Sequence, residues 1–501
     1  MDIDSVKSDS VKREFLAVVL AGFGNELLPL TGDYGDEPCP KALLPVANKP
    51  MLEYTLSWIE KSGIRDVLLI CPTSHRPSIY HYIHSDVTSS SLRIDLQTFD
   101  ESQDGGVGTC TVLRHFSSRV PEDFVVVPCD FIPPPTLPLS MLLNKFRVDS
   151  VAEGCVATTC WYSAYRPDKA ALVDEWGPLP APSPIIWDDL TGTLLYIDTS
   201  DDVDRNTDEL ELRMALLSRH PRAILSSSLQ DSHVYVCRRS VLDLLHIKRH
   251  FDGFRQEFLP WLCRVQYQRV KREKYKHVLN PMIDTTSQRL ALRHSTLLSR
   301  RLELAGPIQE STMSIPPSPT DSDAEQDLKT GLKIGVVIHR AESGFALRVN
   351  TVHNFLEINR RALNGVTYAL PSDPKNRSLI DQKAQIASDT IIGDFTQVSE
   401  RTMIKKSIVG RHCVIGKGAK ISASVLLDHC VIEDGAKLDG CILGKNTKVR
   451  TKSELARCVT QAGYDIGPGD IVKGEKLEIS DWTAAVDDDG IEGDESSECH
   501  G

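Results

Sequence analysis

The feature that most constrains the fold of this 501-residue chain is a repeat of short apolar steps near its C-terminus. Apolar residues recur there in steps of 6, 6 and 5, so every third step closes a unit of 17. Neither the 3.6-residue period of an α-helix nor the alternation of a single strand produces this spacing. A three-sided coil does, because each side turns one apolar residue inward and stacked coils bury a continuous column. The positions in register are Ile392, Val398, Ile404, Val409, Ile415, Ile421, Leu426, Ile432, Leu438, Leu443 and Val449.

This hexapeptide pattern predicts a parallel β-helix over residues 378–475. Cys413 and Cys430 are also separated by one full unit of the repeat, and thiols at such positions can act as small apolar fillers. An irregular β-sandwich with chance spacing is the alternative. Eleven positions in register make that alternative the weaker interpretation. We therefore expect a rigid, elongated domain that is well suited to assembly.

Composition and charge exclude several classes of protein. The chain has 57 Lys and Arg against 69 Asp and Glu, a net charge of −12, so a dedicated nucleic-acid-binding role is not expected. The first 14 residues lack the apolar run of a secretory signal, and no stretch of about 20 apolar residues predicts a membrane span. The 13 cysteines include no Cys-x-x-Cys pair, so we predict neither a zinc site nor a disulfide framework. The reducing cytosol is the expected compartment.

An α/β domain is expected ahead of the repeat, from residue 13 to about 290. Apolar segments that suit strands alternate there with an amphipathic segment that suits a helix. Such alternation is typical of a largely parallel sheet that helices cover on both faces. The predicted strands are Phe15–Leu20, Val67–Cys71 and Phe124–Val127, and the predicted helix is Met51–Ser62.

Three further segments complete the expected organisation. Proline and acidic residues dominate residues 306–331, which predicts a disordered linker without a core. Residues 332–377 are expected to connect the linker to the β-helix, and residues 476–501 to form an acidic tail. The predicted elements of the connector are a strand at Ile334–His339, a turn at Ser343-Gly344, a strand at Phe345–Val349 and a helix at Thr351–Leu363.

A glycine-containing segment follows the first predicted strand and carries Gly22 and Gly24. Two glycines after a strand are a weak signal by themselves, since tight turns often contain them. The string Pro40-Lys-Ala-Leu-Leu-Pro-Val-Ala-Asn-Lys-Pro-Met-Leu-Glu-Tyr54 that comes next is long enough to be specific. Together the two segments resemble the fingerprint of the nucleotidyltransferases that make nucleotide sugars. The resemblance implies a Rossmann-like mixed sheet for the α/β domain.

The resemblance also assigns candidate nucleotide-binding residues, which we regard as vestigial. In active members of the family, the lysine equivalent to Lys41 contacts phosphate, the residues equivalent to Gly108-Thr109 hold the base, and the aspartate equivalent to Asp130 binds a metal. Alternatives stay open: Lys41 instead caps a loop or pairs with an acid, and Asp130 is instead a turn residue, which we favour. The candidate residues are Gly22, Gly24, Lys41, Gly108, Thr109 and Asp130.

The chain departs from the family pattern where catalysis requires a cation. Asn25 and Glu26 stand where the family has Thr-Arg. Nucleotidyl transfer needs cations beside the phosphates and Mg²⁺ between carboxylates and phosphates. At ~4 Å and an effective dielectric constant near 20, each unit-charge interaction is of order 4 kcal/mol, and a carboxylate reverses its sign. His233 likewise takes the place of a glycine near the sugar. We therefore predict a degraded site with no catalytic residues and no metal.

A pyrophosphorylase-like domain joined to a left-handed β-helix occurs in two groups of proteins. One group is the active sugar-nucleotide enzymes, and the other is the γ and ε subunits of eukaryotic translation initiation factor 2B. The ε subunits carry a further C-terminal exchange domain, for which the acidic end of this chain leaves no room. The chain therefore resembles the γ subunits more closely, from Phe15 to about Gly474. The strings that carry this resemblance are Asp231–Cys237, Gln256–Leu262, Leu347–Thr351 and Glu357–Arg360.

The resemblance implies a structural and regulatory role rather than catalysis. A γ subunit would pair with ε and brace it against the α, β and δ subunits, in a complex that accelerates GDP release from the GTPase initiation factor 2. No cofactor is expected, although GTP or ATP bound without turnover is compatible with a degraded pocket. No direct nucleic-acid partner and no membrane contact are implied. The alternative function is that of an active sugar-1-phosphate nucleotidyltransferase, such as a mannose-1-phosphate guanylyltransferase.

Overall fold

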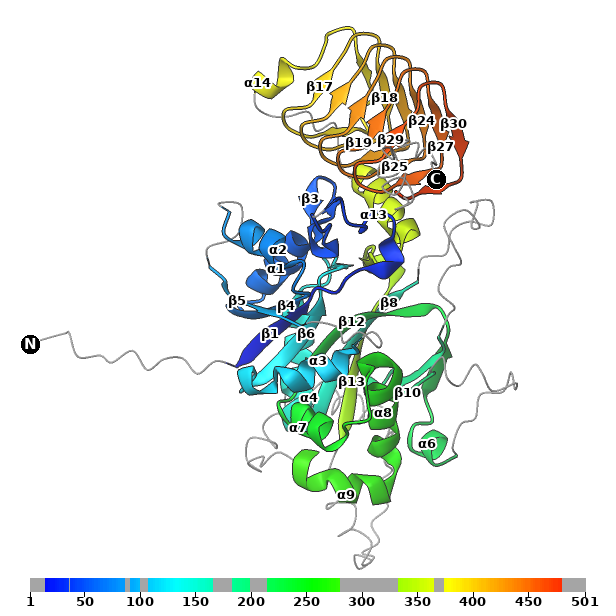
Figure 1. The fold of residues 1–501 in the computed structure, drawn as a ribbon. Helices are drawn as coiled ribbons and strands as arrows, with labels where there is room; N and C mark the ends of the chain where they lie inside the picture. Colours follow the sequence, from blue (N-terminus) through cyan, green and yellow to red (C-terminus); the bar gives the residue numbers. More distant parts are fainter. Residues whose placement is uncertain are drawn as a thin grey trace, which may run out of the picture. The chain divides into compact units, whose positions relative to one another are not determined.

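The computed structural model describes residues 14–35, 37–85, 91–99, 107–164, 183–198, 214–279, 332–364 and 374–479. These residues form two compact units (Figure 1). The first unit comprises the described residues up to Phe23, residues 40–44 and the described part of 49–350, and the second unit comprises the rest. The predicted linker at 306–331 and the part of the predicted tail beyond Ile479 lie outside the described residues.

A mixed sheet forms the core of the first unit, as the sequence predicted. The described residues give it ten strands in the order β11-β9-β10-β13-β8-β12-β6-β1-β4-β5. Strand β1 pairs in parallel with β4 and β6, whereas β12 is antiparallel to both β6 and β8. Strands β1, β4 and β6 are apolar along nearly their whole length, as expected for strands whose two faces are both buried. The bounds are β1 (Phe15–Leu20), β4 (Asp66–Cys71), β5 (Arg93–Thr98), β6 (Asp123–Pro128), β8 (Cys155–Ser163), β9 (Ile185–Asp188), β10 (Thr193–Ile197), β11 (Ala223–Ser226), β12 (Leu229–Cys237) and β13 (Lys333–His339).

Amphipathic helices cover this sheet. Helix α1 begins at Met51, as predicted, and buries Leu52, Leu56 and Ile59 on one side. Helix α4 packs against β8 and β13, and α8 packs against β10 and β13. The helices of the first unit are α1 (Met51–Lys61), α2 (Arg76–Ile83), α3 (Thr109–His115), α4 (Leu139–Glu153), α6 (Met214–Arg219), α7 (Ser240–Ile247), α8 (Leu259–Tyr267) and α9 (Arg269–Leu279), with short helical turns η2 (Lys41–Leu43), η3 (Ser117–Arg119), η4 (Phe254–Phe258) and η5 (Ala341–Ser343).

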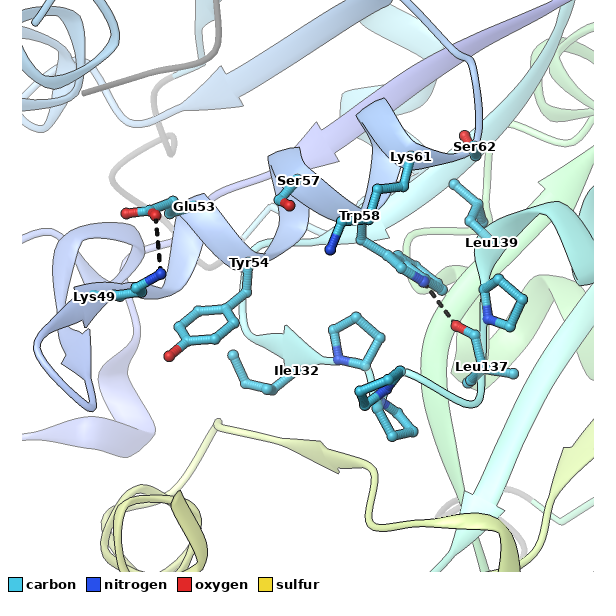
Figure 2. A pocket seen from close by; sticks show the side chains of 14 residues that line it. Lys49, Glu53, Tyr54, Ser57, Trp58, Lys61, Ser62, Ile132, Leu137 and Leu139 are labelled. Atoms are coloured by element: carbon cyan, nitrogen blue, oxygen red, sulfur yellow. Dashed lines mark hydrogen bonds and ion pairs between the residues drawn. The ribbon is translucent and has the colours of Figure 1, made fainter. Parts of the chain in front are cut away.

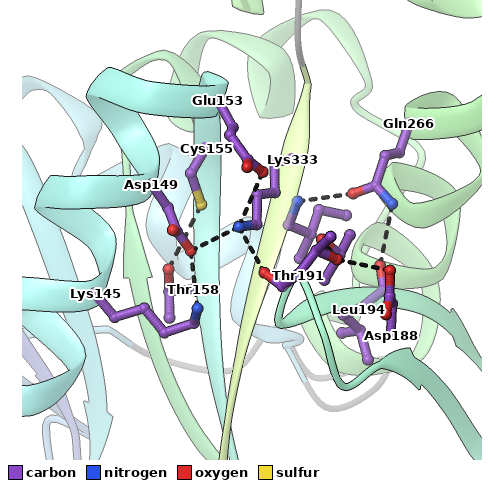
Figure 3. A network of polar contacts seen from close by, with 12 residues as sticks. Lys145, Asp149, Glu153, Cys155, Thr158, Asp188, Thr191, Leu194, Gln266 and Lys333 are labelled. Atoms are coloured by element: carbon purple, nitrogen blue, oxygen red, sulfur yellow. Dashed lines mark hydrogen bonds and ion pairs between the residues drawn. The ribbon is translucent and has the colours of Figure 1, made fainter. Parts of the chain in front are cut away.

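The prediction that residues 332–377 form a separate connector is wrong for its first strand. Strand β13 lies inside the large sheet, antiparallel to β10 and parallel to β8. Figure 3 shows what holds it there: the buried Lys333 Nζ lies 3.1 Å from both Asp149 Oδ2 and Glu153 Oε2. Gln266 Oε1 accepts a hydrogen bond from the Ile334 amide at 2.7 Å. Contacts with residues distant in the sequence therefore override the local pattern of a hairpin.

The second predicted strand of the connector, Phe345–Val349, does not pair with the first one across the turn. Strand β14 (Leu347–Arg348) is antiparallel to β7 (Phe131–Ile132), and Arg348 stands opposite Phe131. The predicted turn at Ser343-Gly344 does occur, with Gly344 at φ 125°. The strands on either side of this turn, β13 and β14, belong to different sheets and do not pair with each other.

The second unit contains the predicted β-helix, as three stacks of parallel strands in the described residues. Equivalent residues of successive coils face each other in register: Ile404 pairs with Ile421, and Ile421 pairs with Leu438. The inward column is almost fully buried, and Cys413 and Cys430 are buried fillers within it. The last strand pairs Lys476 with Val459, so the coils continue slightly beyond the predicted boundary at 475.

The short strands of the coils belong to three stacks. The first stack is β15 (Gln385–Ile386), β18 (Met403–Lys405), β21 (Lys420–Ser422), β24 (Lys437–Asp439), β27 (Glu454–Ala456) and β30 (Ile471–Lys473). The second is β16 (Ile391–Ile392), β19 (Ile408–Val409), β22 (Val425–Leu426), β25 (Ile442–Leu443), β28 (Val459–Thr460) and β31 (Lys476–Leu477). The third is β17 (Gln397–Val398), β20 (Val414–Ile415), β23 (Val431–Ile432), β26 (Lys448–Val449) and β29 (Asp465–Ile466).

Other segments of the second unit pack with the coils. Helix α13 agrees with the helix predicted over Thr351–Leu363, and its Asn359 Oδ1 accepts a hydrogen bond from the Ala47 amide at 2.9 Å. Asn48 Nδ2 donates to the Val409 carbonyl at 2.8 Å. The remaining elements are η1 (Asn25–Leu27), β2 (Pro45–Val46), α13 (Val352–Asn364) and α14 (Pro374–Arg377), and β3 (Lys49–Pro50) belongs to the first unit.

The inward column predicts a sharp difference between neighbouring residues of one strand. Ile415 is fully buried, whereas the adjacent Val414 is 40% exposed. Ile415→Ala should destabilise the β-helix by about 2–5 kcal/mol through lost burial and a cavity, and Val414→Ala by less than about 1 kcal/mol. The loss of unfolding free energy in each variant is measured by urea unfolding, with hydrogen exchange of residues 403–443 as the probe of the β-helix. Equal losses would contradict the three-sided coil.

Candidate functional site

The candidate site is a cavity of about 200 Å³ in the first unit. It lies where the parallel strands β1 and β6 end, because Leu20 and Pro128 are the last residues of these strands and both line it. The carboxyl ends of parallel strands are the usual binding edge of such sheets. The lining residues are Leu20, Gly22, Lys41, Thr109, Leu113, Val126, Pro128, Cys129, Asp130, His233, Tyr235, Phe254, Arg255 and Arg348.

Asp130 is the central charged group of this cavity, and only 1% of it is exposed. Arg348 Nε donates to Asp130 Oδ1 at 3.0 Å and lies 3.2 Å from Oδ2. Lys41 Nζ forms an ion pair with the same Oδ2. The pairing of β14 with β7 brings Arg348 beside Asp130, because Arg348 stands opposite Phe131. Two cations of the chain itself therefore satisfy both carboxylate oxygens.

The ion pairs fix the protonation state of Asp130. Burial by itself would raise the pKa of this carboxyl, but Arg348 and Lys41 outweigh burial and hold its pKa well below the usual range. Asp130 is therefore a carboxylate at neutral pH. A buried carboxylate with two cationic partners is stable only while both partners remain in place.

A second polar cluster lines the cavity beside Asp130. Asp231 Oδ2 accepts a hydrogen bond from the Tyr235 hydroxyl at 2.7 Å and lies 3.1 Å from Arg255 Nε. The Arg255 guanidinium lies 5.1 Å from the centre of the Trp161 ring. These contacts use both charges of the Asp231–Arg255 pair within the protein.

His233 occupies a backbone conformation that favours glycine, with φ 57°. Its amide donates to Asp231 Oδ1 at 2.9 Å, which holds the turn in place. Burial, followed by the nearby Arg348, lowers the pKa of His233 well below its ordinary value, so the imidazole is neutral. The conformation agrees with the resemblance, in which a glycine stands at this position.

The structure brings together four of the six predicted site residues: Gly22, Lys41, Thr109 and Asp130 line the cavity. Lys41 pairs with an acid, Asp130, which is one of the alternatives left open for it, and its contact with phosphate stays a prediction. Asp130 does lie in a turn, but its carboxylate also forms buried ion pairs, so the turn alone does not explain it.

The other two predicted residues have different roles. Gly108 does not line the cavity, and its amide donates to Asp252 Oδ1 at 3.0 Å. A Cβ at Gly108 would lie 2.3 Å from the Asp252 carbonyl oxygen, so close packing requires glycine there. Gly24 belongs to the second unit. Glu26 also belongs there and is exposed, so its repulsion of a bound triphosphate stays a prediction.

The sequence did not identify Arg348, Arg255 and Tyr235 as site residues. Arg348 is 218 residues from Asp130 and lies in the string Leu347–Thr351, which carries part of the resemblance but indicates no partner for the arginine. No local pattern marks a guanidinium as the partner of a distant carboxylate. The string Asp231–Cys237 carries part of the resemblance, but the hydrogen bond from Tyr235 to Asp231 follows only from the folded structure.

The segment after β1 is held on the β-helix within the second unit. Gln461 Nε2 donates to the Asp33 carbonyl at 2.8 Å. Gly463 lies against the Tyr34 ring, because a Cβ at Gly463 would come within 1.8 Å of that ring. Asp33 and Tyr34, which follow the residues that depart from the nucleotidyltransferase pattern, therefore pack on the coils.

A larger groove of about 460 Å³ also lies on the first unit, beside α1 and a proline-rich turn. Figure 2 shows its lining, in which Lys49 pairs with Glu53 at 3.7 Å and Trp58 Nε1 donates to the Leu137 carbonyl at 2.8 Å. None of the predicted site residues lines it. Lys49, Glu53 and Trp58 are engaged in structural contacts, so we do not regard this groove as the candidate site.

Two family models match the chain. The nucleotidyl transferase model matches residues 16–161, and the model of the eIF2B subunit epsilon LbH domain matches residues 374–472. The parallel stacks of the second unit are consistent with the left-handed β-helix of the latter model. The translation initiation factor eIF2B subunit gamma of Schizosaccharomyces pombe is 34% identical over 268 residues, which cover 53% of this chain and 54% of the relative.

The chain is similar to the gamma subunits of eIF2B. The eIF2B subunit gamma of Dictyostelium discoideum is 23% identical over 411 residues, which cover 75% of this chain and 83% of the relative. The eIF2B subunit epsilon of the same organism is 22% identical over 260 residues, or 52% of this chain and 34% of the relative. The matched region thus spans only about half the length of the S. pombe eIF2B subunit gamma. Among the described residues, no helix has the length and apolar character needed to cross a membrane.

The ion pairs of Asp130 predict a specific dependence of stability on pH. Since the folded pKa is lowered, Asp130 stabilises the fold above its unfolded pKa of about 3.9, and this contribution is lost as pH falls through the folded pKa. Asp130→Asn should cost about 3–5 kcal/mol at pH 7 by leaving two cations buried. The difference from wild type should shrink as pH falls below about 4.

Denaturant unfolding between pH 3 and pH 7 measures this effect. Asp95→Asn is the matched control, because Asp95 is exposed and pairs with Arg119 at 2.9 Å on the surface. The control should cost less than about 1 kcal/mol. A loss at Asp130 that stays the same down to pH 3, or that is no larger than the loss at Asp95, would contradict the buried ion pairs.

Because Tyr34 packs directly on Gly463, a side chain added at Gly463 should loosen the segment that contains Tyr34. Gly463→Ala should release Asp33 and Tyr34 from the coils and raise their hydrogen exchange, with an overpacking cost of about 1–3 kcal/mol. Gly469→Ala is the control, because Gly469 has the same φ of 76° and no atom within 4 Å of the added Cβ. Adding Tyr34→Ala to Gly463→Ala should remove the overpacking cost. If hydrogen exchange at Asp33 and Tyr34 is the same in Gly463→Ala and Gly469→Ala, the contact between Tyr34 and Gly463 is disproved.

Proposed function

We propose that this chain is a non-catalytic structural and regulatory subunit of the guanine nucleotide exchange factor eIF2B, equivalent to its γ subunit. It pairs with the catalytic ε subunit, contacts the α, β and δ subunits, and helps the complex to promote GDP release from the GTPase initiation factor 2. The observation that carries this proposal is the occupation of both Asp130 oxygens by Lys41 and Arg348. The gamma and epsilon relatives support the assembly.

The Mg²⁺ ion that nucleotidyl transfer uses does not fit the residues present. Such an ion takes carboxylate oxygens and substrate phosphates as ligands. Asp130 offers neither of its oxygens, because Arg348 and Lys41 hold them. Within the described residues, no group of three or more His, Cys, Asp and Glu side chains could form a metal site. A metal at Asp130 would have to displace the partly buried Arg348 guanidinium or the buried Lys41 ammonium group, so we derive no catalytic step through it.

The second unit supports a role in assembly. Stacked coils form a rigid body whose terminal coils carry unpaired backbone groups, and such edges are commonly covered by a neighbouring chain. The family model that matches these coils is that of the epsilon subunit's domain. The cytosol is the compartment in which we expect the complex, with no direct contact to nucleic acid or membrane. Binding of GTP or ATP without turnover stays a prediction.

Co-expression with the ε subunit tests the proposal. We expect the two chains to co-purify as one complex, and we expect the pair to release labelled GDP from initiation factor 2 faster than ε alone. An active sugar-nucleotide pyrophosphorylase with the same two-domain architecture is the control and should not co-purify. If the chain stays a monodisperse monomer in the presence of ε, and exchange is unchanged, the proposal fails.

A further inference from the structure

A strongly basic surface surrounds helix α9 of the first unit. The helix has five Lys and Arg residues and one Glu among its 11 residues, a net charge of 5 − 1 = +4. The whole chain, in contrast, has a net charge of −12. Tyr275 and Leu279 fix the buried side of α9, and the helix packs against α7 and α8 (Figure 1). The positive charge is therefore concentrated in one place on an otherwise acidic protein.

Aromatic rings, not carboxylates, position two cations of this surface: Lys274 of α9, and Lys248, which directly follows α7. Lys248 Nζ lies 5.6 Å from the centre of the Trp261 ring and 5.4 Å from the centre of the Tyr275 ring. Lys274 Nζ lies 5.7 Å from the centre of the same Tyr275 ring. The quadrupole of an aromatic ring attracts an ammonium group without neutralising its charge. The charge of both lysines therefore remains available to a partner.

The acidic residues of the surrounding structure do not balance this charge. Glu273, the acidic residue of α9, pairs with Lys276 at 3.7 Å. Within the part of the chain that the structure describes, no carboxylate pairs with Arg249, Arg269 or Lys274, all of which are exposed. Like charges held close together repel one another, and an anionic partner relieves that repulsion.

Apolar side chains are exposed on the same group of helices. Val270 of α9 is 83% exposed, and Ile247 at the end of α7 is 52% exposed. A nucleic acid would match the cations through its phosphates but would gain little from the exposed aliphatic groups. A protein segment with both carboxylates and apolar side chains matches both features.

We propose that the α9 surface, which consists of Lys248, Arg249, Arg269, Val270 and Lys274, docks an acidic protein segment with interspersed apolar side chains. None of these five residues lines the candidate site. The docking surface is therefore separate from the vestigial pocket, and its partner does not depend on the proposed assembly.

Fluorescence anisotropy with the full chain and defined probes tests this docking surface. The first probe is a labelled 16-residue peptide of Asp, Glu and Leu, and the second has Ser in place of Leu at equal charge. The third is an oligouridylate of equal charge. We expect the Leu-containing peptide to bind most tightly, with an affinity that falls as salt rises from 50 to 200 mM.

Variants locate the binding on the protein. Arg269→Glu with Lys274→Glu should weaken binding of the Leu-containing peptide by about tenfold or more. Lys405→Glu with Lys420→Glu changes the net charge equally at exposed β-helix positions and should change the affinity by less than about twofold. Val270→Ser should weaken binding of the Leu-containing peptide but not of the Ser-containing one. Circular dichroism and thermal unfolding confirm that each variant is folded.

Three results would overturn the proposal. The first is no binding of the Leu-containing peptide by the wild-type chain at 50 mM salt. The second is an equal loss of affinity in the α9 and β-helix variants, which would indicate unspecific attraction. The third is tighter binding of the oligouridylate than of the peptide, lost in the α9 variant, which would make the surface a nucleic-acid site.

Discussion

The buried ion pairs of Asp130 with Lys41 and Arg348 are the interaction on which the candidate site depends. A carboxylate that is almost fully buried is costly unless partners compensate for its lost hydration. Here the partners come from the turn η2 and from β14, so the pairing also ties distant parts of the chain together. In the proposed function, the same contacts that stabilise the carboxylate also keep it from binding a metal ion. The fold of the site and the proposed absence of catalysis therefore have one physical cause.

The parts of the fold that the sequence predicted are those set by repeating or local patterns. Each coil of the β-helix places its own apolar residues inward, so their regular spacing predicted the parallel stacks before any contact was known. The position of β13 could not be predicted in this way, because Asp149 and Gln266 hold it from distant elements. The role of Arg348 was hidden for the same reason: only the pairing of β14 with β7 brings it to Asp130.

The altered segment after β1 has a structural role in the second unit. Asp33 accepts a hydrogen bond from Gln461, and Tyr34 packs on Gly463, where no side chain would fit. These partners come from opposite ends of the sequence, so the sequence alone showed a departure from the family pattern but not its reason.

The central claim is that a pocket whose carboxylate is held by its own cations does not transfer nucleotides. Its most direct test is the incubation of the pure chain with mannose 1-phosphate, GTP and Mg²⁺, with pyrophosphate and nucleotide sugar measured against a blank without protein. We predict no product above the blank, both for the wild-type chain and for Lys41→Ala. Product formation that Lys41→Ala abolishes would contradict the account and would identify the chain as an active nucleotidyltransferase.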